Sequence, residues 1–256
     1  MPNLFLELRD DDDTPGTTPA SLPDQAALEV LRDAEIAASK LIPWGSNYSF
    51  AVALEMPDGP TQLAIYKPRA GEAPLYDFPD GTLYLREVAA YELSRWLGWG
   101  IVPPTLVRDG PHGVGSVQLY VEPDEPTDTA RFWGATHPEI ERVVLFDHIA
   151  NNADRKIGHC LRDKRGKVWG IDHGLTFNRF PKLRTVLWQY VGEPVSPDLR
   201  ADLDRMVNGT SELRPALAPY LDEGEVDALI ERARRFRDAG CYPPLNPRRN
   251  VPYGWW

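Results

Sequence analysis

The sequence predicts an α+β fold with a small, strand-rich first part and a larger, mostly helical second part. In the first part, two runs of strand-forming residues flank the turn sequence PDGP, which is typical of a β-hairpin. Apolar residues at three- and four-residue spacing follow the hairpin and recur through the second part, where they indicate amphipathic helices. We expect an N-terminal strand with a mobile acidic linker, a first lobe, a second lobe and a Pro- and Trp-rich tail, over 1–23, 24–123, 124–240 and 241–256.

The first lobe opens with a helical pattern. Ala27, Leu31 and Ile36 form an apolar stripe that predicts one helix over 24–40, with Asp24 as its N-cap.

The predicted hairpin strands are SFAVALEM and TQLAIYKP, and Lys67 lies near the end of the second strand. A helix over 84–98 should follow, because Leu85, Val88 and Leu93 belong to an apolar stripe at helical spacing and Gly98 stands where a C-cap falls. Two further strands, within GIVPPTLVRDG and GVGSVQLYVEP, complete the lobe. The insert between Lys67 and the helix, RAGEAPLYDFPDGT, is either a border of the site or a plain solvent loop.

The second lobe begins with a predicted helix over 138–151. The following NNADRKIGHCL and VWGIDHGLTF indicate a polar loop, two short strands that flank the turn DKRGK, and a second polar loop. Helices near 196–218 and 223–239 should close the lobe, and the proline-rich tail should lie on the surface.

The composition is that of an ordinary globular protein, with 42% hydrophobic and 26% charged residues. The formal net charge of -10 argues against nonspecific binding to nucleic acid or to an anionic bilayer. Cys160 and Cys241 form no CxxC pair, so we expect a reducing compartment and no zinc knuckle. The chain shows neither an export signal nor eighteen consecutive apolar residues, so we expect a cytoplasmic protein that does not span a membrane.

The stretch from Asn151 to His173 contains the most informative polar residues, Asp154, His159 and Asp172. They lie in two loops that flank a short hairpin, so their side chains are expected to converge. One or two carboxylates, completed by phosphate oxygens and water, are what Mg²⁺ requires. This pattern predicts a magnesium-nucleotide site.

These loops resemble those of a known superfamily. NADRKIGH is similar to the catalytic loop of the phosphatidylinositol 3/4-kinase-like and HipA-like branch of protein-kinase-like enzymes, and GIDHGLTF resembles their IDFG-type metal loop. The whole chain also resembles a family of uncharacterised actinobacterial-type proteins classed with the phosphatidylinositol kinases, through strings such as GSNYSFAV and NNADRKIGHC. The resemblance implies a bilobal protein-kinase-like fold, with a β-rich N-lobe and a helical C-lobe.

The resemblance also implies residue roles. Asp154, with its neighbour Arg155, would act on the acceptor hydroxyl, and Asp172 would hold the metal, Mg²⁺ or Mn²⁺. Lys156 stands where the family has His, and His159 stands where it has a metal-binding Asn, which makes the metal site softer than usual.

In the first lobe, Lys67 would contact the phosphates of ATP and pair with Glu87, with Glu92 as the rival partner. The remaining nucleotide contacts would come from the loop WGSNYSF and from backbone groups after the last strand. They are Gly45, Ser46, Asn47, Leu119, Tyr120 and Val121.

The function that these residues predict is ATP-dependent phosphoryl transfer to a hydroxyl of a protein or small molecule, with a lipid acceptor less favoured. A second hypothesis is a pseudokinase-type nucleotide-binding or regulatory module, which the substitution of His159 for Asn supports. A third is a metal-dependent hydrolase that would use Asp147, His148 and His173 with the three residues above, although no HExxH or HxH spacing occurs.

Overall fold

The computed structural model describes residues 24–57, 59–124 and 129–254. The predicted N-terminal strand, the acidic linker, Trp255 and Trp256 lie outside these residues. The chain forms two compact units, of which the first comprises the described residues up to Val88 with Pro103–Pro123, and the second comprises Ala89–Val102 with the chain from Asp124 onward.

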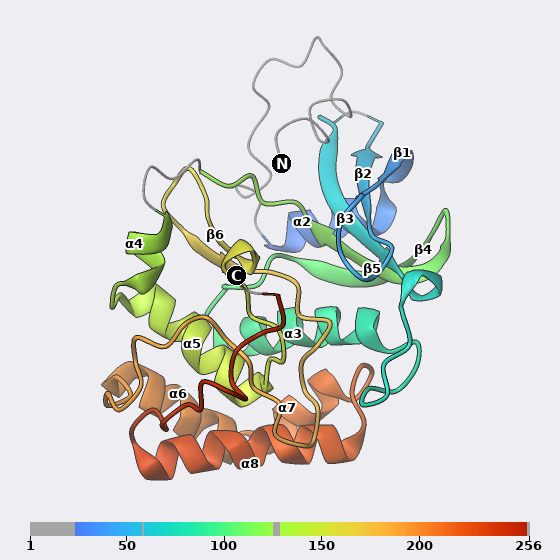
Figure 1. The fold of residues 1–256 in the computed structure, drawn as a ribbon. Coiled ribbons are helices and arrows are strands. Elements are labelled where there is room, and N and C mark those ends of the chain that lie inside the picture. Colours follow the sequence, from blue (N-terminus) through green and yellow to red (C-terminus); the bar gives the residue numbers. More distant parts are fainter. Residues whose placement is uncertain (1–23, 58, 125–128, 255–256) are drawn as a thin grey trace. The chain divides into compact units, whose positions relative to one another are not determined.

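The first unit is built on a five-stranded antiparallel sheet in the order β1-β2-β3-β5-β4 (Figure 1). Its strands are β1 (Glu35–Leu41), β2 (Phe50–Glu55), β3 (Gln62–Pro68), β4 (Thr105–Gly110) and β5 (Gly113–Leu119). The predicted hairpin is present as β2 and β3, in which Phe50 pairs with Tyr66 and Leu54 with Gln62.

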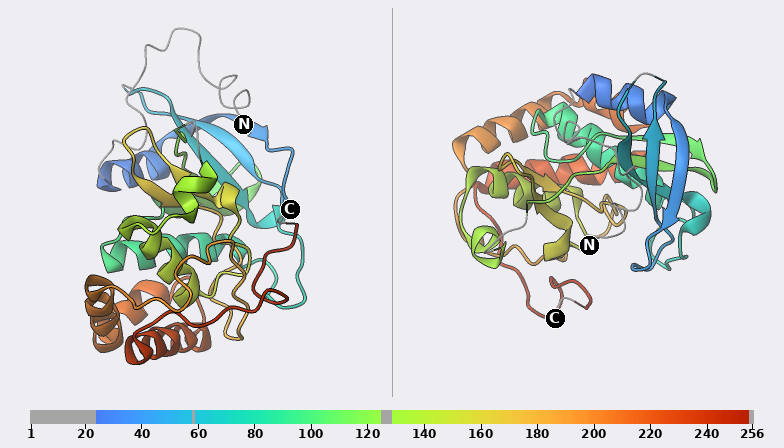
Figure 2. Two further views of the ribbon diagram at one scale, coloured as in Figure 1. Left: turned by 60° about the vertical axis from the view of Figure 1, so that its left-hand side comes forward. Right: turned by 90° about the horizontal axis from the view of Figure 1, so that it is seen from above.

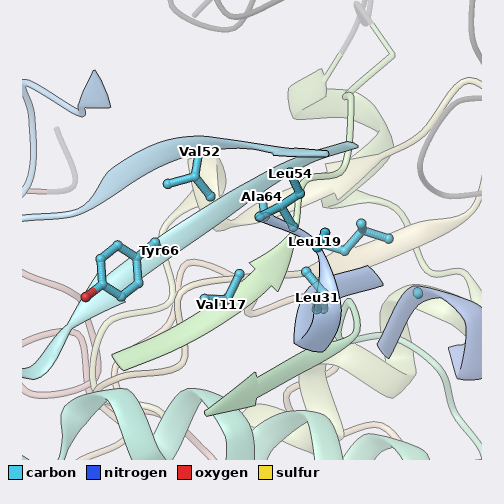
Figure 3. Close-up of a cluster of buried hydrophobic side chains, with 9 residues drawn as sticks. Leu31, Val52, Leu54, Ala64, Tyr66, Val117 and Leu119 are labelled. Carbon is cyan, nitrogen blue, oxygen red and sulfur yellow. The ribbon is translucent and has the colours of Figure 1, made fainter. Parts of the chain in front are cut away.

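Helix α2 (Asp24–Asp33) covers one face of this sheet (Figure 2). Figure 3 shows the apolar side chains that meet there, and they are Leu31, Val52, Leu54, Ala64, Tyr66, Val117 and Leu119. Side chains alternate along a strand, so Lys67 follows Tyr66 on the opposite face, which Leu63 and Ile65 also occupy.

The prediction of a single helix over 24–40 is wrong in its second half, because 35–41 form strand β1. Their exposure alternates residue by residue, which is the period of a strand. Pairing with β2, from Glu35 opposite Glu55 to Leu41 opposite Phe50, satisfies the backbone groups that face β2. This long-range pairing outweighs the local helical pattern.

Helix α3 (Leu83–Leu97) begins in the first unit and continues into the second. It ends at Gly98, whose φ of +72° is the left-handed conformation of a C-cap.

The second unit contains α4 (Thr129–Gly134), α5 (Pro138–Ala150), α6 (Pro197–Asn208), α7 (Thr210–Leu217) and α8 (Glu223–Ala239), with the short hairpin β6 (Cys160–Arg162) and β7 (Val168–Gly170). Helix α8 contacts both α5 and α6 (Figures 1 and 2). A reciprocal capping box between Asp222 and Glu225 fixes its start.

The predicted helix near 196–218 is two helices. They are separated at Gly209, where an added Cβ would lie 2.8 Å from the carbonyl oxygen of Arg205. No helix within the described residues combines the length and apolar character needed to cross a bilayer.

Candidate active site

In the first unit, the ammonium group of Lys67 forms an ion pair with the carboxylate of Glu87. Glu87 is buried on α3, whereas the rival Glu92 pairs with Arg95. Glu72 fixes the start of α3, since its carboxylate accepts hydrogen bonds from the N–H groups of Leu83 and Tyr84 at 3.1 and 2.8 Å. The helix that carries Glu87 is therefore anchored one turn before that residue.

The loop that contains Gly45, Ser46 and Asn47 is held by the insert that follows β3. The side-chain oxygen of Asn47 accepts the N–H of Ala73 at 2.8 Å, so this oxygen already has a structural partner. The next residue, Tyr48, donates its N–H to the carbonyl of Gly71 at 2.9 Å. A Cβ at Gly71 would lie 2.6 Å from the Tyr48 carbonyl oxygen, so only glycine permits this approach. The insert is thus a support for the loop.

Three residues were predicted to contact adenine through backbone groups, and the N–H groups of two of them are bonded within the fold. Leu119 donates to Pro104 at 2.9 Å and Tyr120 donates to Leu63 at 3.0 Å. Among the described residues, the N–H of Val121 has no backbone acceptor.

In the second unit, the β6–β7 hairpin brings the two predicted metal ligands together. Cys160 pairs with Gly170, and just beyond this pair Ile171 donates its N–H to the carbonyl of His159 at 2.9 Å. The two loops leave the hairpin side by side. As a result, Nε2 of His159 lies 3.2 Å from Oδ2 of Asp172.

Asp172 has a left-handed backbone, with φ of +59°. Asp tolerates this conformation better than most residues, but it still costs about 1–2 kcal/mol. Such conformations concentrate at functional sites, where surrounding contacts maintain them. About half of the Asp172 side chain is exposed to solvent. One carboxylate and one imidazole in this position suit a divalent cation that takes its other ligands from phosphate and water.

Asp154 lies in a turn that the side chain of Asn152 stabilises. The side chain of Asn152 accepts the N–H of Asp154 at 3.0 Å and donates to Oδ1 of Asp147 at 2.9 Å. Asp154 is partly exposed, and its carboxylate lies 2.8 Å from the ammonium group of Lys156. A carboxylate fixed in this way, with access to solvent, can accept a proton from a bound hydroxyl group.

Arg155 is fully buried, so it has no access to a substrate. Its guanidinium forms a bidentate ion pair with Asp147, at 2.8 and 2.9 Å, and donates to the carbonyls of His159 and Ile171 at 3.0 and 2.9 Å. These are the positions that carry or precede the two candidate metal ligands. We therefore correct the expected catalytic role of Arg155, because its geometry is that of a positioning residue.

Arg155 stays protonated although it is buried. Burial is the largest single effect and opposes the charged form. The charge of Asp147, its hydrogen bond to Arg155, and the effects of Cys160 and Asp172 together outweigh burial, so the pKa of Arg155 is raised. Nη2 of Arg155 also lies 2.8 Å from Nε2 of His173. Arginine can only donate, so Nε2 of His173 must accept and the proton of this imidazole is assigned to Nδ1.

The residues that support the loops were not anticipated from the sequence. Asn151 caps α5 in a left-handed conformation and bonds to the carbonyls of Asn178 and Phe180 and to the N–H of Lys182. Adjacent asparagines after an amphipathic helix are a recognisable C-cap signal that could have indicated this role.

Two of the residues proposed for a metal-dependent hydrolase, Asp147 and His148, are engaged in other contacts. His148 packs against Phe236 and Tyr242, and burial lowers its pKa to about 4. Asp147 is engaged with Arg155. The described part of the chain contains no cluster of three or more His, Cys, Asp or Glu side chains that could hold a metal. Asp147 and His148 are therefore both engaged in structural contacts.

Comparison with known structures shows the fold. Fam20 from hydra, in a structure with sugar, superposes with a TM-score of 0.54 at 17% identity, over 83% of this chain and 86% of that chain. The Golgi casein kinase with Mn/ADP bound superposes with a TM-score of 0.56 at 16% identity, over 84% and 74%. The fold is thus kinase-like, as the loop resemblance implied.

Sequence comparison finds one relative that matches part of this chain and one that matches most of it. Phosphatidylinositol 4-kinase gamma 4 of Oryza sativa subsp. japonica is 32% identical over 139 residues, which are 46% of this chain and only 25% of that protein. No family model matches. Protein Rv2133c of Mycobacterium tuberculosis is 35% identical over 261 residues, which cover 88% of this chain and 93% of that protein. The chain belongs to the same family as Rv2133c, a family with a kinase-like fold.

Proposed function

We propose that this protein is a phosphotransferase that moves the terminal phosphoryl group of ATP to a hydroxyl group, with Mg²⁺ or Mn²⁺ as the divalent cation. The observation that carries the proposal is that His159 and Asp172 lie 3.2 Å apart. Arg155, the neighbour of Asp154, donates hydrogen bonds to the carbonyls of His159 and Ile171 and so connects Asp154 to both loops. The Mn/ADP bound to the structurally similar Golgi casein kinase supports it.

Asp172 and His159 would hold the cation, which neutralises charge on the phosphates during transfer. The role of Asp154 is to orient the acceptor hydroxyl and to take its proton as the new oxygen–phosphorus bond forms. The bond from the terminal phosphorus to the bridging oxygen then breaks, and ADP leaves.

Lys67, held by Glu87, would bind phosphate oxygens as a point charge. The N–H of Val121 is the group we assign to adenine, because those of Leu119 and Tyr120 are used within the fold. In the loop that contains Gly45, Ser46 and Asn47, we assign the phosphate contacts to the backbone of Gly45 and Ser46, since the side-chain oxygen of Asn47 accepts the N–H of Ala73.

Thermal unfolding of the full chain tests the nucleotide site. ATP with Mg²⁺ or Mn²⁺ is expected to raise the melting temperature, because a ligand that binds only the folded state stabilises it. The variant Asp172→Asn should lose this gain. Asp204→Asn is the matched control, since Asp204 is exposed on α6 and its nearest ion-pair distance is 3.8 Å.

Formation of ADP then tests the chemistry. Metal-dependent ADP release that is lost in Asp154→Asn supports phosphoryl transfer. Nucleotide binding without metal dependence, together with no ADP release, would instead support the pseudokinase-type module.

A further inference from the structure

The segment around Arg184 runs directly beside the loop that holds Asp154. Arg184 donates its N–H to the carbonyl of Asn152 at 2.8 Å, and its own carbonyl accepts the N–H of Arg155 at 3.0 Å. Val186 donates back to the carbonyl of Arg155 at 3.1 Å. These bonds form a parallel bridge in which Arg155 is opposite Thr185. Asp154 and Arg184 are therefore lateral neighbours, one residue earlier on each segment.

The bridge also determines which face these side chains occupy. Arg155 and Thr185 are 0% and 1% exposed, so their side chains point into the protein. Successive side chains in extended backbone point to opposite sides, which places Asp154 and Arg184 together on the outer side. Both residues are partly exposed. Lys156 reaches the same side, since its ammonium group lies 2.8 Å from Asp154.

Within the described residues, the guanidinium of Arg184 has no carboxylate partner. Instead it lies 4.7 Å from the ring centroid of Tyr253, with Nη2 at 3.4 Å from the Tyr253 hydroxyl. An aromatic ring stabilises the charge of an arginine through its face, so the in-plane N–H donors remain available except the Nη2–H that is donated to the Tyr253 hydroxyl. Tyr253 is itself 76% exposed, so solvent reaches this pair.

The backbone on both sides of Arg184 is anchored by the C-terminal tail. Asn250 donates to the carbonyl of Leu183 at 2.7 Å, and its own carbonyl accepts the N–H of Thr185 at 3.0 Å. Arg184 is thus presented by a fixed segment. The chain has a net charge of -10, yet Arg184 has no acidic partner among the described residues. It lies beside Asp154, the carboxylate that we expect to contact the acceptor hydroxyl.

We propose, on the basis of the phosphotransferase function above, that Arg184 binds an anionic group of the acceptor. The acceptor is then a small hydroxyl compound that carries a phosphate or a carboxylate, with the anion on Arg184 and the hydroxyl at Asp154. The guanidinium fork matches both anions in geometry. In the transfer, the hydroxyl proton passes to Asp154, the oxygen bonds to the terminal phosphorus of ATP, and ADP is the leaving group.

A matched acceptor series tests this inference. Glycerol, glycerate and glycerol 3-phosphate share one hydroxyl-bearing scaffold and differ in carrying no anion, a carboxylate or a phosphate. Calorimetric titration uses the full chain saturated with Mg²⁺ and the non-hydrolysable analogue AMP-PNP. At least one anionic compound should bind roughly tenfold or more tightly than glycerol, because its anion forms charge-assisted hydrogen bonds with the guanidinium.

Arg184→Gln should remove this preference, and Arg184→Lys should retain part of it. Arg234→Gln, which removes the same charge from an exposed position on α8, should leave it unchanged. Melting temperatures of the variants establish that they fold. Phosphatidylglycerol and phosphatidylcholine vesicles form a separate arm, which shows whether the same anion is recognised on a lipid headgroup.

The inference is overturned if the three compounds bind equally, if none binds, or if Arg184→Gln leaves the preference intact. Binding of AMP-PNP is measured first and reports on the proposed function alone. If AMP-PNP does not bind, orthophosphate is titrated into wild-type protein and Arg184→Gln, so that the anion site is still tested. Arg184-dependent binding of orthophosphate supports the subsite, and its absence removes the subsite together with the kinase proposal.

Discussion

Arg155 and Asp147 form a bidentate ion pair in which neither side chain is more than 1% exposed. Arg155 directly follows Asp154 and also donates to the carbonyls of His159 and Ile171, so the pair holds the segments that carry Asp154, His159 and Asp172. We expect Arg155→Met to leave the carboxylate of Asp147 buried without its partner and to lower the free energy of unfolding by about 3–5 kcal/mol. Urea denaturation measures this loss.

The double variant Arg155→Met with Asp147→Asn provides the control, because it removes both charges. It should be more stable than Arg155→Met alone. The single variant Asp147→Asn completes the cycle. A loss in the double variant equal to the sum of the losses in Arg155→Met and Asp147→Asn would show that the pair is not coupled.

Substitution of Lys67 should reduce catalysis without unfolding the protein. Lys67→Met is expected to lower kcat/KM for ATP on the order of 100-fold, which is typical for removal of one group that stabilises charge in a transition state. Glu87→Gln should have a smaller effect in the same direction, because Glu87 acts through Lys67. Glu92→Gln is the control on the same helix, since Glu92 pairs with Arg95. Equal losses in both glutamate variants would contradict the assignment of Glu87.

His159 should influence the choice of metal. An imidazole nitrogen is a softer ligand than an amide oxygen, so we expect higher activity with Mn²⁺ than with Mg²⁺ in the wild-type protein. His159→Asn supplies a hard oxygen donor and should shift the activity ratio toward Mg²⁺. ADP release with each metal at saturating concentration gives the ratio. A ratio that does not change would exclude His159 as a ligand.

His148 should make the protein less stable in acid. Burial lowers its pKa from 6.5 to about 4, so the unfolded chain binds more protons than the folded one between these values. The contribution is fully present above pH 6.5 and is lost as the pH falls toward 4. At about 1.4 kcal/mol per pKa unit, it amounts to roughly 3 kcal/mol.

His148→Phe tests this dependence, because a phenyl ring can keep the edge-to-face packing against Phe236. Unfolding free energies at pH 7, 5.5 and 4 should decline less steeply in the variant. Parallel declines in the two proteins would assign the acid sensitivity to other groups.

Asn151 should stabilise the loops through both its backbone and its side chain. Asn151→Gly keeps the left-handed conformation, with φ of +55° in the parent, but removes the hydrogen bonds to 178, 180 and 182. We expect a loss of about 1–3 kcal/mol. Asn151→Ala should lose about 1–2 kcal/mol more, because alanine adds strain in this conformation. Chemical denaturation of the two variants separates the contributions, and equal losses would show that the backbone strain is negligible.

Much of the fold could be predicted because its signals are local. The PDGP turn and the strand-forming residues around it identify the β2–β3 hairpin, and the apolar stripe that ends at Gly98 identifies α3. By contrast, 35–41 carry a pattern compatible with a helix, and only their pairing with β2 makes them a strand. The break at Gly209 was missed for a related reason, since apolar spacing continues through it.

In the candidate site, too, some features could be predicted from local sequence and others depended on tertiary structure. The residue types and their order in NADRKIGH and GIDHGLTF predict a metal-nucleotide site, and two loops that flank a short hairpin were expected to bring Asp172 close to His159, as they do at 3.2 Å. Tertiary structure decided the role of Arg155, whose burial against Asp147 depends on packing that no local pattern encodes. It likewise decided the position of Arg184 beside Asp154, because a hydrogen-bonded contact between segments thirty residues apart in sequence depends on the folded path of the chain.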